Sequence, residues 1–599
     1  MRKLVEKSIN VLPERKYPLY KVVYRIVTMQ VKTTPFHILL SILLSLISGF
    51  MILFIVMVTQ RLFDSISDAA MGFAIFRDVF TPLLIYTSVT LGSQVLSVLY
   101  NLHLTILLSK SQGRIMALLQ KKLQRIDAAF FENTDFLDDL NKAREATFVI
   151  PHFTMVAYMI VFFYGTFFIS IGVYLFNLKP ILLITIAIAF VPAMLSQYVR
   201  TKIFTKLETQ SAPLRREVEY YQRSICDREY FKETRILGAY KFFHKLFTDT
   251  ITLLMQKMWR SERKATILNV SLNLTSFLGM AAVTYFLFTA TMSGEITVGA
   301  FAAVFAALSN IFQIMQEIVN YQIGTLSNNF GKVMNFVKTM DTIERDGENL
   351  TPEFSKGIVA ANISFMYPGR DTYAVNDISL NISPGETIAI VGENGAGKST
   401  LVRLLTGIYL PTEGNVTVGG LNTKNTAPAY MFSGLSGVFQ KYQRYKMTLR
   451  ENVTISALDS EISGNAHNDI KILTEETKIK TALKEAGSEL SDAELDDMLA
   501  PDFDGIDLSG GQWQRLAIAR GIYRDNGYII LDEPTAAIDP IEEKRVFEQF
   551  EKLAKNKCAI LVTHRLGSVK LANRVIVLDE GKIVDIGTHD ELIKRPGKY

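Results

Sequence analysis

Long stretches without charged residues dominate the first half of the chain. Six of them contain no Asp, Glu, Lys or Arg over a length that suits a transmembrane helix, which needs roughly 20 residues to cross about 30 Å of hydrocarbon. They lie near residues 35–59, 79–108, 149–176, 180–199, 266–293 and 297–316. Buried helices of soluble proteins rarely stay uncharged for so long, so the pattern predicts a membrane domain of six spanning helices.

The charged residues between these stretches lie mostly on one side of the predicted membrane. Residues 1–34, 109–148 and 200–265 are rich in Lys and Arg, whereas the opposite connections have few. The positive-inside bias therefore predicts that both termini are cytoplasmic. The long inner connections have a helical composition, so helices two to five are expected to extend well past the bilayer. Residues 18–31, PLYKVVYRIVTMQV, fit an amphipathic helix on the membrane surface, and we expect no signal peptide.

A few polar residues interrupt the apolar stretches: His103, Asn269, Asn273 and Gln313. Side chains of this kind can form hydrogen bonds between helices or reach the membrane interface, and they can also line a transport path. The sequence favours the first explanation and leaves the second open.

After residue 344 the pattern becomes that of a soluble α/β domain. Short apolar runs at 387–391, 528–532 and 559–563 alternate with helical segments, which indicates a parallel sheet covered by helices. A charged segment rich in small residues near 341–356 marks the boundary.

The predicted fold class is thus a multi-domain membrane protein, with a six-helix transmembrane domain followed by an α/β P-loop nucleotide-binding domain. We place a cytoplasmic N-terminus with an interfacial helix at 1–34, the transmembrane domain at 35–340 and the nucleotide-binding domain at 345–599.

Composition and charge agree with this division. The chain has 599 residues, of which 49% are hydrophobic, and a formal net charge of +5. Residues 1–344 hold 35 Lys and Arg against 23 Asp and Glu, and the remainder holds 29 against 36. A basic apolar part followed by an acidic part fits a membrane protein and not a nucleic-acid binder. The two cysteines, Cys226 and Cys558, predict neither a disulfide framework nor a zinc site.

A phosphate-binding loop is predicted at GENGAGKST, residues 392–400, directly after the apolar run 387–391. The segment matches G-x-x-x-x-G-K-[ST], in which glycines let backbone amides turn toward phosphate oxygens at the start of a helix. Lys398 would lie near the β- and γ-phosphates, and Ser399 could hold Mg²⁺. Downstream, a strand ends in Asp532, which could reach Mg²⁺, and Glu533, which could polarise the attacking water.

These motifs resemble those of the ATP-binding cassette (ABC) transporters. Residues 508–512 read LSGGQ, the family's signature, and the whole chain resembles an exporter-type half-transporter with six spans ahead of one cassette. In that family the signature contacts the γ-phosphate of ATP held by the opposite cassette. The resemblance implies that each ATP lies between Lys398 of one cassette and Ser509 of another, so that two cassettes pair head to tail.

Further site residues follow from the resemblance, position by position. Tyr367 matches the aromatic residue that stacks on adenine, Gln440 the glutamine that contacts Mg²⁺ and the attacking water, and His564 the histidine that contacts the γ-phosphate. Asp539 matches the loop that crosses the dimer interface. The implied catalytic residues are Glu533, His564 and Gln440, and the implied metal ligands are Ser399, Gln440 and Asp532. The implied ATP-binding residues are Tyr367, Gly392, Asn394, Gly395, Ala396, Gly397, Lys398, Ser399, Thr400, Ser509, Gly510, Gly511, Gln512 and Asp539.

The membrane half resembles the exporters too. Residues 130–144 and 228–238 are similar to their inner loops, and we expect the segments that dock into the cassettes near 135–140 and 220–225. The segment before the signature, APDFDGID (500–507), departs from the pattern of many exporters. Together with Trp513 it resembles exporters of lantibiotics and related ribosomal peptides. We expect no N-terminal cysteine protease, since about 34 residues precede the first span.

The expected function is ATP-driven export by alternating access, with ATP and Mg²⁺ as cofactors. The expected partners are a second copy of the chain or a sister half-transporter, the lipid bilayer and an exported solute, with a peptide as one cargo and no nucleic acid. Drug or lipid export, an ATP-gated channel or sensor, and an importer are the alternatives. The expected location is a bacterial plasma membrane, with the cassette in the cytoplasm.

Overall fold

The computed structural model describes residues 17–73, 75–439, 441–458, 472, 474–524, 526–532, 547–548, 550–551, 554–555, 557–563 and 566–599. The chain forms two compact units. The membrane unit contains Leu140–Met340 together with the described residues up to Leu119. The cassette unit contains Asp341–Tyr599 together with Gln120–Asp139, although this last segment lies within the predicted transmembrane domain 35–340.

Long helices make up the membrane unit, and six of them are long and apolar enough to cross a membrane. The elements are α2 (Leu19–Thr33), α3 (Pro35–Ala70), α4 (Phe76–Gln124), α5 (Thr134–Met159), η2 (Ile160–Tyr164), α6 (Gly165–Leu178), α7 (Pro180–Cys226), α8 (Arg228–Ile236), α9 (Tyr240–Met292), α10 (Val298–Gln316), η3 (Glu317–Ile323) and α11 (Gly324–Met340). The six spans predicted from the uncharged stretches are therefore confirmed as helices, and the predicted surface helix forms as α2.

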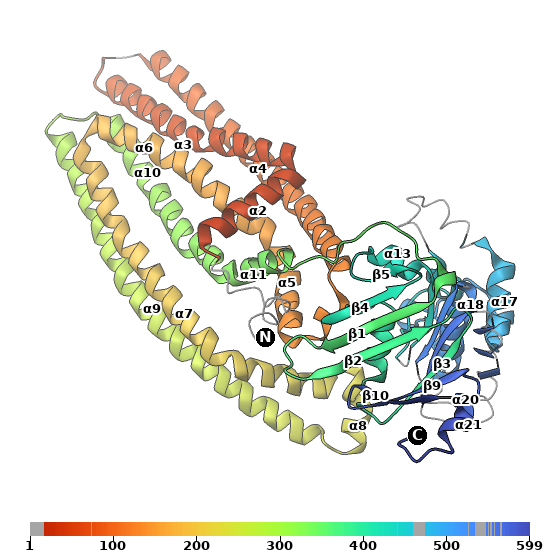
Figure 1. Cartoon of the computed structure of the whole chain (residues 1–599). Coiled ribbons are helices and arrows are strands. Elements are labelled where there is room, and N and C mark those ends of the chain that lie inside the picture. The colour runs from red at the N-terminus through yellow and green to blue at the C-terminus, as the bar shows by residue number, and fades with distance from the viewer. Residues whose placement is uncertain are drawn as a thin grey trace. The chain divides into compact units, whose positions relative to one another are not determined.

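Three of these helices are far longer than a bilayer requires. They contain 49 residues in α4, 47 in α7 and 53 in α9, against the roughly 20 that cross the hydrocarbon. Helices α7 and α9 lie side by side along most of their length (Figure 1). These lengths agree with the expected extension of the helices past the bilayer, which stays a prediction.

Two short π-helical segments interrupt the third and the sixth spanning helices. The segment η2 joins α5 to α6, and η3 joins α10 to α11 without a break in the helix. Glycine follows each of them, Gly165 after η2 and Gly324 after η3. A π-helical turn bonds residue i to residue i+5, and such turns occur frequently at functional sites.

Two β-sheets form the frame of the cassette unit. Strands β1 (Ile358–Met366), β2 (Tyr373–Ile382), β4 (Glu413–Val418) and β5 (Leu421–Asn422) form an antiparallel sheet in the order β2-β1-β4-β5. Strands β3 (Thr387–Val391), β6 (Leu435–Val438), β7 (Tyr528–Asp532), β8 (Cys558–Val562), β9 (Arg574–Asp579) and β10 (Lys582–Gly587) form the second sheet, in the order β10-β9-β3-β8-β7-β6. Its strands pair in parallel except β9 with β10. The three predicted apolar strands are β3, β7 and β8, so the predicted parallel sheet is confirmed.

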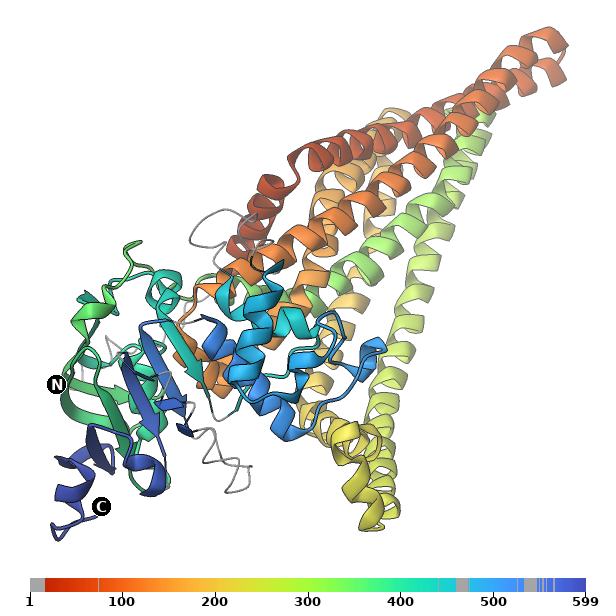
Figure 2. The ribbon, with the colours of Figure 1, turned by 90° about the vertical axis from the view of Figure 1, so that its right-hand side faces the viewer.

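Short helices cover the sheets or form a cluster beside them. They are α12 (Lys398–Leu405), α13 (Pro428–Ser433), α14 (Leu449–Thr454), α17 (Glu476–Glu485), α18 (Gly510–Arg524), α20 (Leu566–Val569) and α21 (His589–Leu592). Helices α14, α17 and α18 contact one another (Figure 2) and share a core around Leu483, Trp513 and Leu516. A separate core between the two sheets includes Ile363, Ile390 and Leu404. The phosphate loop and the signature therefore belong to different packing clusters of the same unit.

Candidate functional site

The phosphate loop adopts the strand-loop-helix arrangement that its sequence predicts. It leaves β3 after Val391, and α12 begins at Lys398. Gly397 occupies the N-cap position in a left-handed conformation, with φ of 98°. The first backbone amides of a helix have no partner within the helix and carry partial positive charge, so the start of α12 suits a phosphate group.

Steric contacts explain why two of the loop residues are glycines. A Cβ atom on Gly392 would lie 2.2 Å from the carbonyl oxygen of Leu578, and one on Gly397 would lie 2.4 Å from that of Ala374. Gly395 also has a positive φ, of 87°, in open space. The backbone can therefore curl inward only with glycine at these positions, and it forms a cradle for an anion.

Two side chains of the cradle have the chemistry that nucleotide and Mg²⁺ require. The Lys398 Nζ donates to the backbone oxygens of Gly392 at 2.9 Å and Glu393 at 3.0 Å, so its ammonium group lies over the loop. Ser399 Oγ lies 3.5 Å from Oδ1 of the buried Asp532 at the end of β7. A hydroxyl and a carboxylate side by side are oxygen ligands of the kind that Mg²⁺ prefers. The residues present thus fit a bound Mg²⁺ and a triphosphate.

The predicted adenine-stacking residue packs beside the loop. Tyr367 donates to or accepts from Thr400 Oγ1 through its hydroxyl at 2.9 Å. Its ring meets Phe365 edge-on at a centroid distance of 5.1 Å and Tyr409 at 6.0 Å. The structure therefore brings Tyr367 close to the phosphate loop, as its proposed role requires.

The signature segment forms the start of α18. The Ser509 backbone amide donates to Gln512 Oε1 at 2.9 Å, and the Gln512 amide donates back to Ser509 Oγ at 3.3 Å. This reciprocal pair closes the first turn of the helix. Leu508 and Trp513 are buried on either side and fix the turn in the helical cluster.

The two signature glycines have no steric reason to be glycine within one chain. A Cβ atom on Gly510 or on Gly511 would meet no atom of the described residues within 4 Å, and neither glycine has a positive φ. These glycines differ in this respect from Gly392 and Gly397. Close approach of a molecule from outside the chain would explain them.

Four residues implied by the resemblance, Gln440, Glu533, Asp539 and His564, lie outside the described part of the chain. Their neighbours in sequence are described: Phe439 follows β6, Asp532 ends β7 and Thr563 follows β8. Parallel strands end at a common sheet edge, and β6, β7 and β8 are adjacent. This strand order agrees with the roles assigned to the four residues, which stay predictions.

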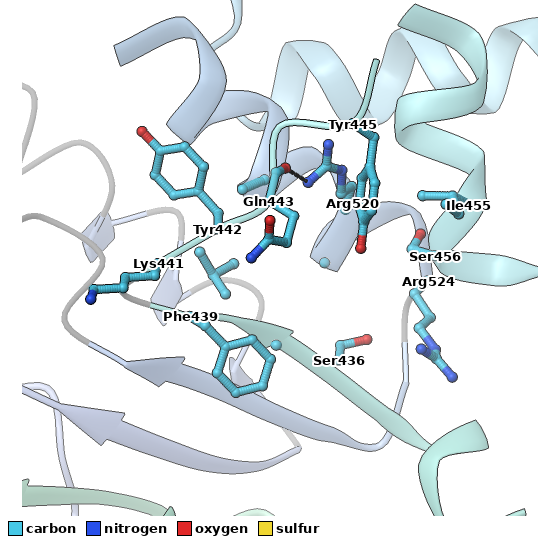
Figure 3. A pocket seen from close by; sticks show the side chains of 14 residues that line it. Ser436, Phe439, Lys441, Tyr442, Gln443, Tyr445, Ile455, Ser456, Arg520 and Arg524 are labelled. Atoms are coloured by element: carbon cyan, nitrogen blue, oxygen red, sulfur yellow. Dashed lines mark hydrogen bonds between the residues drawn. The ribbon is translucent and has the colours of Figure 1, made fainter. Parts of the chain in front are cut away.

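A cavity of about 250 Å³ lies beside the segment that follows β6 (Figure 3). Arg520 of α18 holds its wall together: Nη1 donates to the Gln443 carbonyl oxygen at 2.8 Å, and Nη2 donates to Asn452 Oδ1 at 2.6 Å. The guanidinium group also lies 5.0 Å from the centre of the Tyr445 ring. Arg520 thus ties the segment after β6 to helices α14 and α18.

The 120–139 segment contacts the cassette through a short 3-10 helix, η1 (Ala128–Glu132). Glu132 Oε1 accepts from the Tyr409 hydroxyl at 2.5 Å and from Arg403 Nη1 at 3.1 Å. Burial raises the pKa of Tyr409, and its ring stacks on Phe365 at 5.3 Å. Because Phe365 also contacts Tyr367, a continuous aromatic chain joins Glu132 to the predicted adenine site.

Ion pairs also hold the 120–139 segment at its beginning. Lys122 Nζ donates to Glu344 Oε1 at 2.9 Å, and the Arg345 amide donates to the Arg125 carbonyl oxygen at 2.6 Å. The hydrogen bond from Lys122 holds the pKa of Glu344 below its usual value. These contacts lie at 122–132, and the expected docking position at 135–140 follows them within the same unit as far as Asp139.

The second expected docking position, 220–225, is the last turn of α7, and the short separate helix near it is α8, a few residues later. The docking role of both positions stays a prediction. The helix boundaries beside them have local causes. Asn133 Oδ1 accepts from the amides of Asp135 and Phe136 and so begins α5, while the extended backbone of Asp227 ends α7. Asn133 and Asp227 were the residues in the sequence that could have indicated these helix boundaries.

The polar residues of the spans mostly bond to other helices. His103 Nε2 lies 2.9 Å from the His37 carbonyl oxygen. Asn269 Oδ1 of α9 accepts from Ser196 Oγ of α7 at 2.9 Å, and Asn273 Oδ1 accepts from Gln316 Nε2 of α10 at 3.2 Å. The hydrogen-bonding explanation holds for His103, Asn269 and Asn273. The structure adds a group that the sequence interpretation missed, around Tyr164 and Glu317, which hydrogen bond at 3.0 Å.

Comparison with known proteins agrees with this site. Residues 375–536 match the family described as ABC transporter, and residues 38–315 match the family described as ABC transporter transmembrane region. A solved structure titled "Structure of a bacterial Atm1-family ABC exporter with ATP bound" superposes with a TM-score of 0.73, covering 94% of this chain and 97% of that one at 19% identity. That likeness confirms the predicted fold class.

Curated relatives match over part of their length. The subtilin transport ATP-binding protein SpaT of Bacillus subtilis is 31% identical over 61% of this chain and 58% of its own. The nisin transport ATP-binding protein NisT of Lactococcus lactis subsp. lactis is 28% identical over 66% of this chain and 65% of its own. The ATP-dependent lipid A-core flippase of Photobacterium profundum is 30% identical over 51% of both chains. The chain thus spans less than two thirds of the length of these relatives.

Both halves of the sequence match ABC transporter families, and the phosphate loop, the signature turn and the membrane helices stand in the family's order. The chain therefore belongs to the ABC transporters.

Proposed function

We propose that two copies of this chain form an ATP-driven exporter. The observation that carries the proposal is the contrast between the glycines of the phosphate loop and those of the signature. The loop glycines are required by their own chain, whereas Gly510 and Gly511 leave open space at the start of a helix. A second anion-binding turn with room above it fits the triphosphate held by another copy.

In the proposed site, the amides of residues 392–400 and the Lys398 ammonium group bind the phosphates of ATP, and Tyr367 stacks on the adenine. Ser399 and Asp532 would hold Mg²⁺, which supplies positive charge against the charge that develops during phosphoryl transfer. Glu533 would orient and polarise the attacking water, and Gln440 and His564 would contact the water and the γ-phosphate. Asp539 would lie in the loop that crosses the dimer interface.

ATP binding to the paired cassettes would close them, and hydrolysis would release them. The 120–139 segment supports a route for this movement into the membrane helices, because it is folded onto the cassette and continuous with α4 and α5. A ligand that binds the closed form more tightly shifts the equilibrium toward it, which is the energetic basis of alternating access. We place the cassette and both termini in the cytoplasm of a bacterial cell, from the distribution of Lys and Arg.

A complementation experiment tests the shared ATP site. The Lys398→Ala and Gly511→Ala variants should each lose occluded nucleotide, measured as labelled ATP that stays bound through gel filtration. Mixed dimers of the two variants contain one intact composite site and should recover part of the occlusion. Gly113→Ala is the matched control, because Gly113 is also a helical glycine with no atom within 4 Å of a Cβ, and it should occlude normally. Mixed dimers without recovery would contradict the shared site.

A peptide is the proposed cargo, because two of the relatives are named as subtilin and nisin transport proteins. Proteoliposomes containing the purified chain should accumulate an amphipathic peptide in the presence of ATP and Mg²⁺, and the Glu533→Gln variant should bind ATP without accumulating it. Movement of a lipid instead of the peptide would favour the flippase function of the third relative. Steady ATP hydrolysis without movement of any solute would favour an ATP-gated channel or sensor.

A further inference from the structure

The two π-helical segments meet in one hydrogen-bonded group inside the membrane unit. Tyr164, the last residue of η2, donates its hydroxyl hydrogen to Glu317 Oε1 at 3.0 Å, and Glu317 is the first residue of η3. Gln322, also in η3, donates from Nε2 to the same carboxylate oxygen at 3.3 Å and lies 3.4 Å from the Tyr164 hydroxyl. The third and the sixth spanning helices are therefore joined at a carboxylate.

The π-helical geometry makes this group possible. Glu317 and Gln322 are five residues apart, and in an α-helix the rotation of roughly 100° per residue would separate their side chains by about 140° around the axis. The wider turn of η3 brings residues five apart together instead. Gly324 then lets α7 approach, because a Cβ atom there would lie 2.9 Å from Gln197 Nε2. A group from three helices thus depends on a local departure from regular α-helix.

Glu317 lies at the end of the sixth spanning helix. It is 19 residues from the start of α10 at Val298, which is about 28 Å of helix, so it stands at the far edge of a hydrocarbon core about 30 Å thick, directly after the apolar span Val298–Gln316. An ionisable residue at this edge can face the interior of the bundle or a water-filled path. The side chain of Glu317 is exposed in the single chain, and so is Tyr321, four residues away on the same side of the helix.

Two buried amide oxygens at η3 and the facing part of α7 have no donor within the described residues. Gln322 is 3% exposed and Gln197 is 7% exposed, and the Oε1 atom of each has no hydrogen-bond partner within the described residues. The donation from Gln322 Nε2 to Glu317 fixes which end of that amide is the oxygen. One of these acceptors is on the residue that donates to Glu317, and the other is on a residue beside Gly324, so the group has amide oxygens to spare.

We propose that this group binds a positively charged amine or guanidinium group of the exported solute. An ammonium group has a positive charge and three N–H donors. It can therefore pair with the Glu317 carboxylate and donate hydrogen bonds to the unused amide oxygens. The exposed ring of Tyr321 adds a surface that attracts cations. The belt of Ser196, Asn269, Asn273 and Gln316 ends beside Glu317 in sequence and extends the polar surface across α7 and α9.

This inference rests on the proposed export function and specifies its cargo: solutes with a basic side chain or terminus. The two π-helical segments also place the site on both the third and the sixth spanning helices, so that a change of their relative position alters the distance between Tyr164 and Glu317. The bound cation would therefore be held most tightly in one of the two states of the transporter.

The test uses the purified full-length chain in proteoliposomes and two pairs of probes. One pair is an amphipathic peptide with lysine side chains and the same peptide with every lysine acetylated. The other is a lipophilic primary amine and the alcohol of equal chain length. The wild type should need at least about 10-fold less of the charged member for half-maximal stimulation of ATP hydrolysis. Glu317→Gln should abolish that preference, and Glu317→Asp should retain most of it.

Glu262→Gln is the matched control, because Glu262 is an acidic residue of α9 that pairs with Arg200 at 3.6 Å and takes part in none of the hydrogen bonds described around Glu317. It should keep the charge preference and the basal ATPase activity. If the Glu317 variants hydrolyse no ATP, equilibrium binding of the fluorescent lysine peptide to the detergent-purified protein decides, and affinity in Glu317→Gln should fall about 10-fold.

The outcomes separate this inference from the proposed function. A charge preference that persists in Glu317→Gln, or a wild type that shows no preference in either pair, overturns the cation site. Equal accumulation of both peptides would support peptide export and overturn the inference. A Glu317-dependent preference in the amine pair, without stimulation by peptides, would support the cation site and contradict the peptide cargo.

Discussion

Replacing Glu132 with alanine removes the acceptor that joins the 120–139 segment to the cassette. Tyr409 is 3% exposed, and losing Glu132 leaves its hydroxyl hydrogen without an acceptor while Arg403 Nη1 still donates to its oxygen at 2.7 Å, which costs about 1–2 kcal/mol. The ion pair of Glu132 with Arg403 is partly exposed, at 44% and 36%, and adds about 0.5 kcal/mol after solvent screening. A total of about 1.5–2.5 kcal/mol corresponds to roughly 10- to 60-fold more frequent local opening of η1.

Hydrogen exchange of residues 126–133 in the detergent-purified, nucleotide-free protein measures this opening. The backbone of the segment stays anchored through Ile126 and Glu344, so the amides of η1 should exchange about 10- to 60-fold faster without global unfolding. Glu145→Ala is the control, because its ion pair with Lys332 lies in the membrane unit, and it should leave these amides unchanged.

A double-mutant cycle with Tyr409→Phe makes the prediction stricter. If the hydrogen bond carries most of the effect, Glu132→Ala combined with Tyr409→Phe should open η1 no more often than Glu132→Ala alone. Unchanged exchange in Glu132→Ala, or fully additive effects of the two substitutions, would refute the assignment of this contact.

Three further predictions follow from buried groups. Burial raises the pKa of Cys558 to about 12, so at pH 8 roughly one thiol in 10⁴ is ionised, and a maleimide should label the exposed Cys226 but not Cys558 until the protein unfolds. Trp513→Ala should destabilise the helical cluster by about 3–5 kcal/mol, seen as a lower melting temperature, because its side chain is 2% exposed. The lowered pKa of Glu344 means that its pairing with Lys122 stabilises the fold above the unfolded pKa of about 4.3 and is lost as the pH falls through the folded value. The difference in melting temperature between the wild type and Glu344→Gln should therefore be present at pH 7 and shrink below about pH 4.

The elements that the sequence predicts best are those whose burial leaves little choice of residue. Strands β3 and β7 coincide with their apolar runs because every residue of β7, and all but the last of β3, are buried between covering layers. The spanning helices follow equally well, since a bilayer excludes charge over a fixed length. The chemistry of the phosphate loop is also local, because its glycines and Lys398 lie within a few consecutive residues.

Contacts between distant segments were not predictable in the same way. Nothing in the apolar run around Tyr164 distinguishes a π-helical turn from an α-helical one, since the difference depends on what the turn meets in a neighbouring helix. The end of an uncharged stretch at Glu317 was the only local sign of its role. The contact of Glu132 with Tyr409 joins residues 277 apart, and neither has a special motif.

Glu132 precedes its cassette partners by a long stretch of sequence, and this affects how the protein assembles during synthesis. The ribosome makes the first two spanning helices and the segment between them long before Arg403 and Tyr409 exist, since 271 residues separate Glu132 from Arg403. At about 5–20 residues per second, the segment waits roughly 15–50 s in the cell before its binding surface is complete. Ala129, which is buried in the cassette core, and Ala128, which packs against that core, stay uncovered during that interval. Truncations that lack the cassette should then be substrates of membrane proteases, even though their spanning helices are intact.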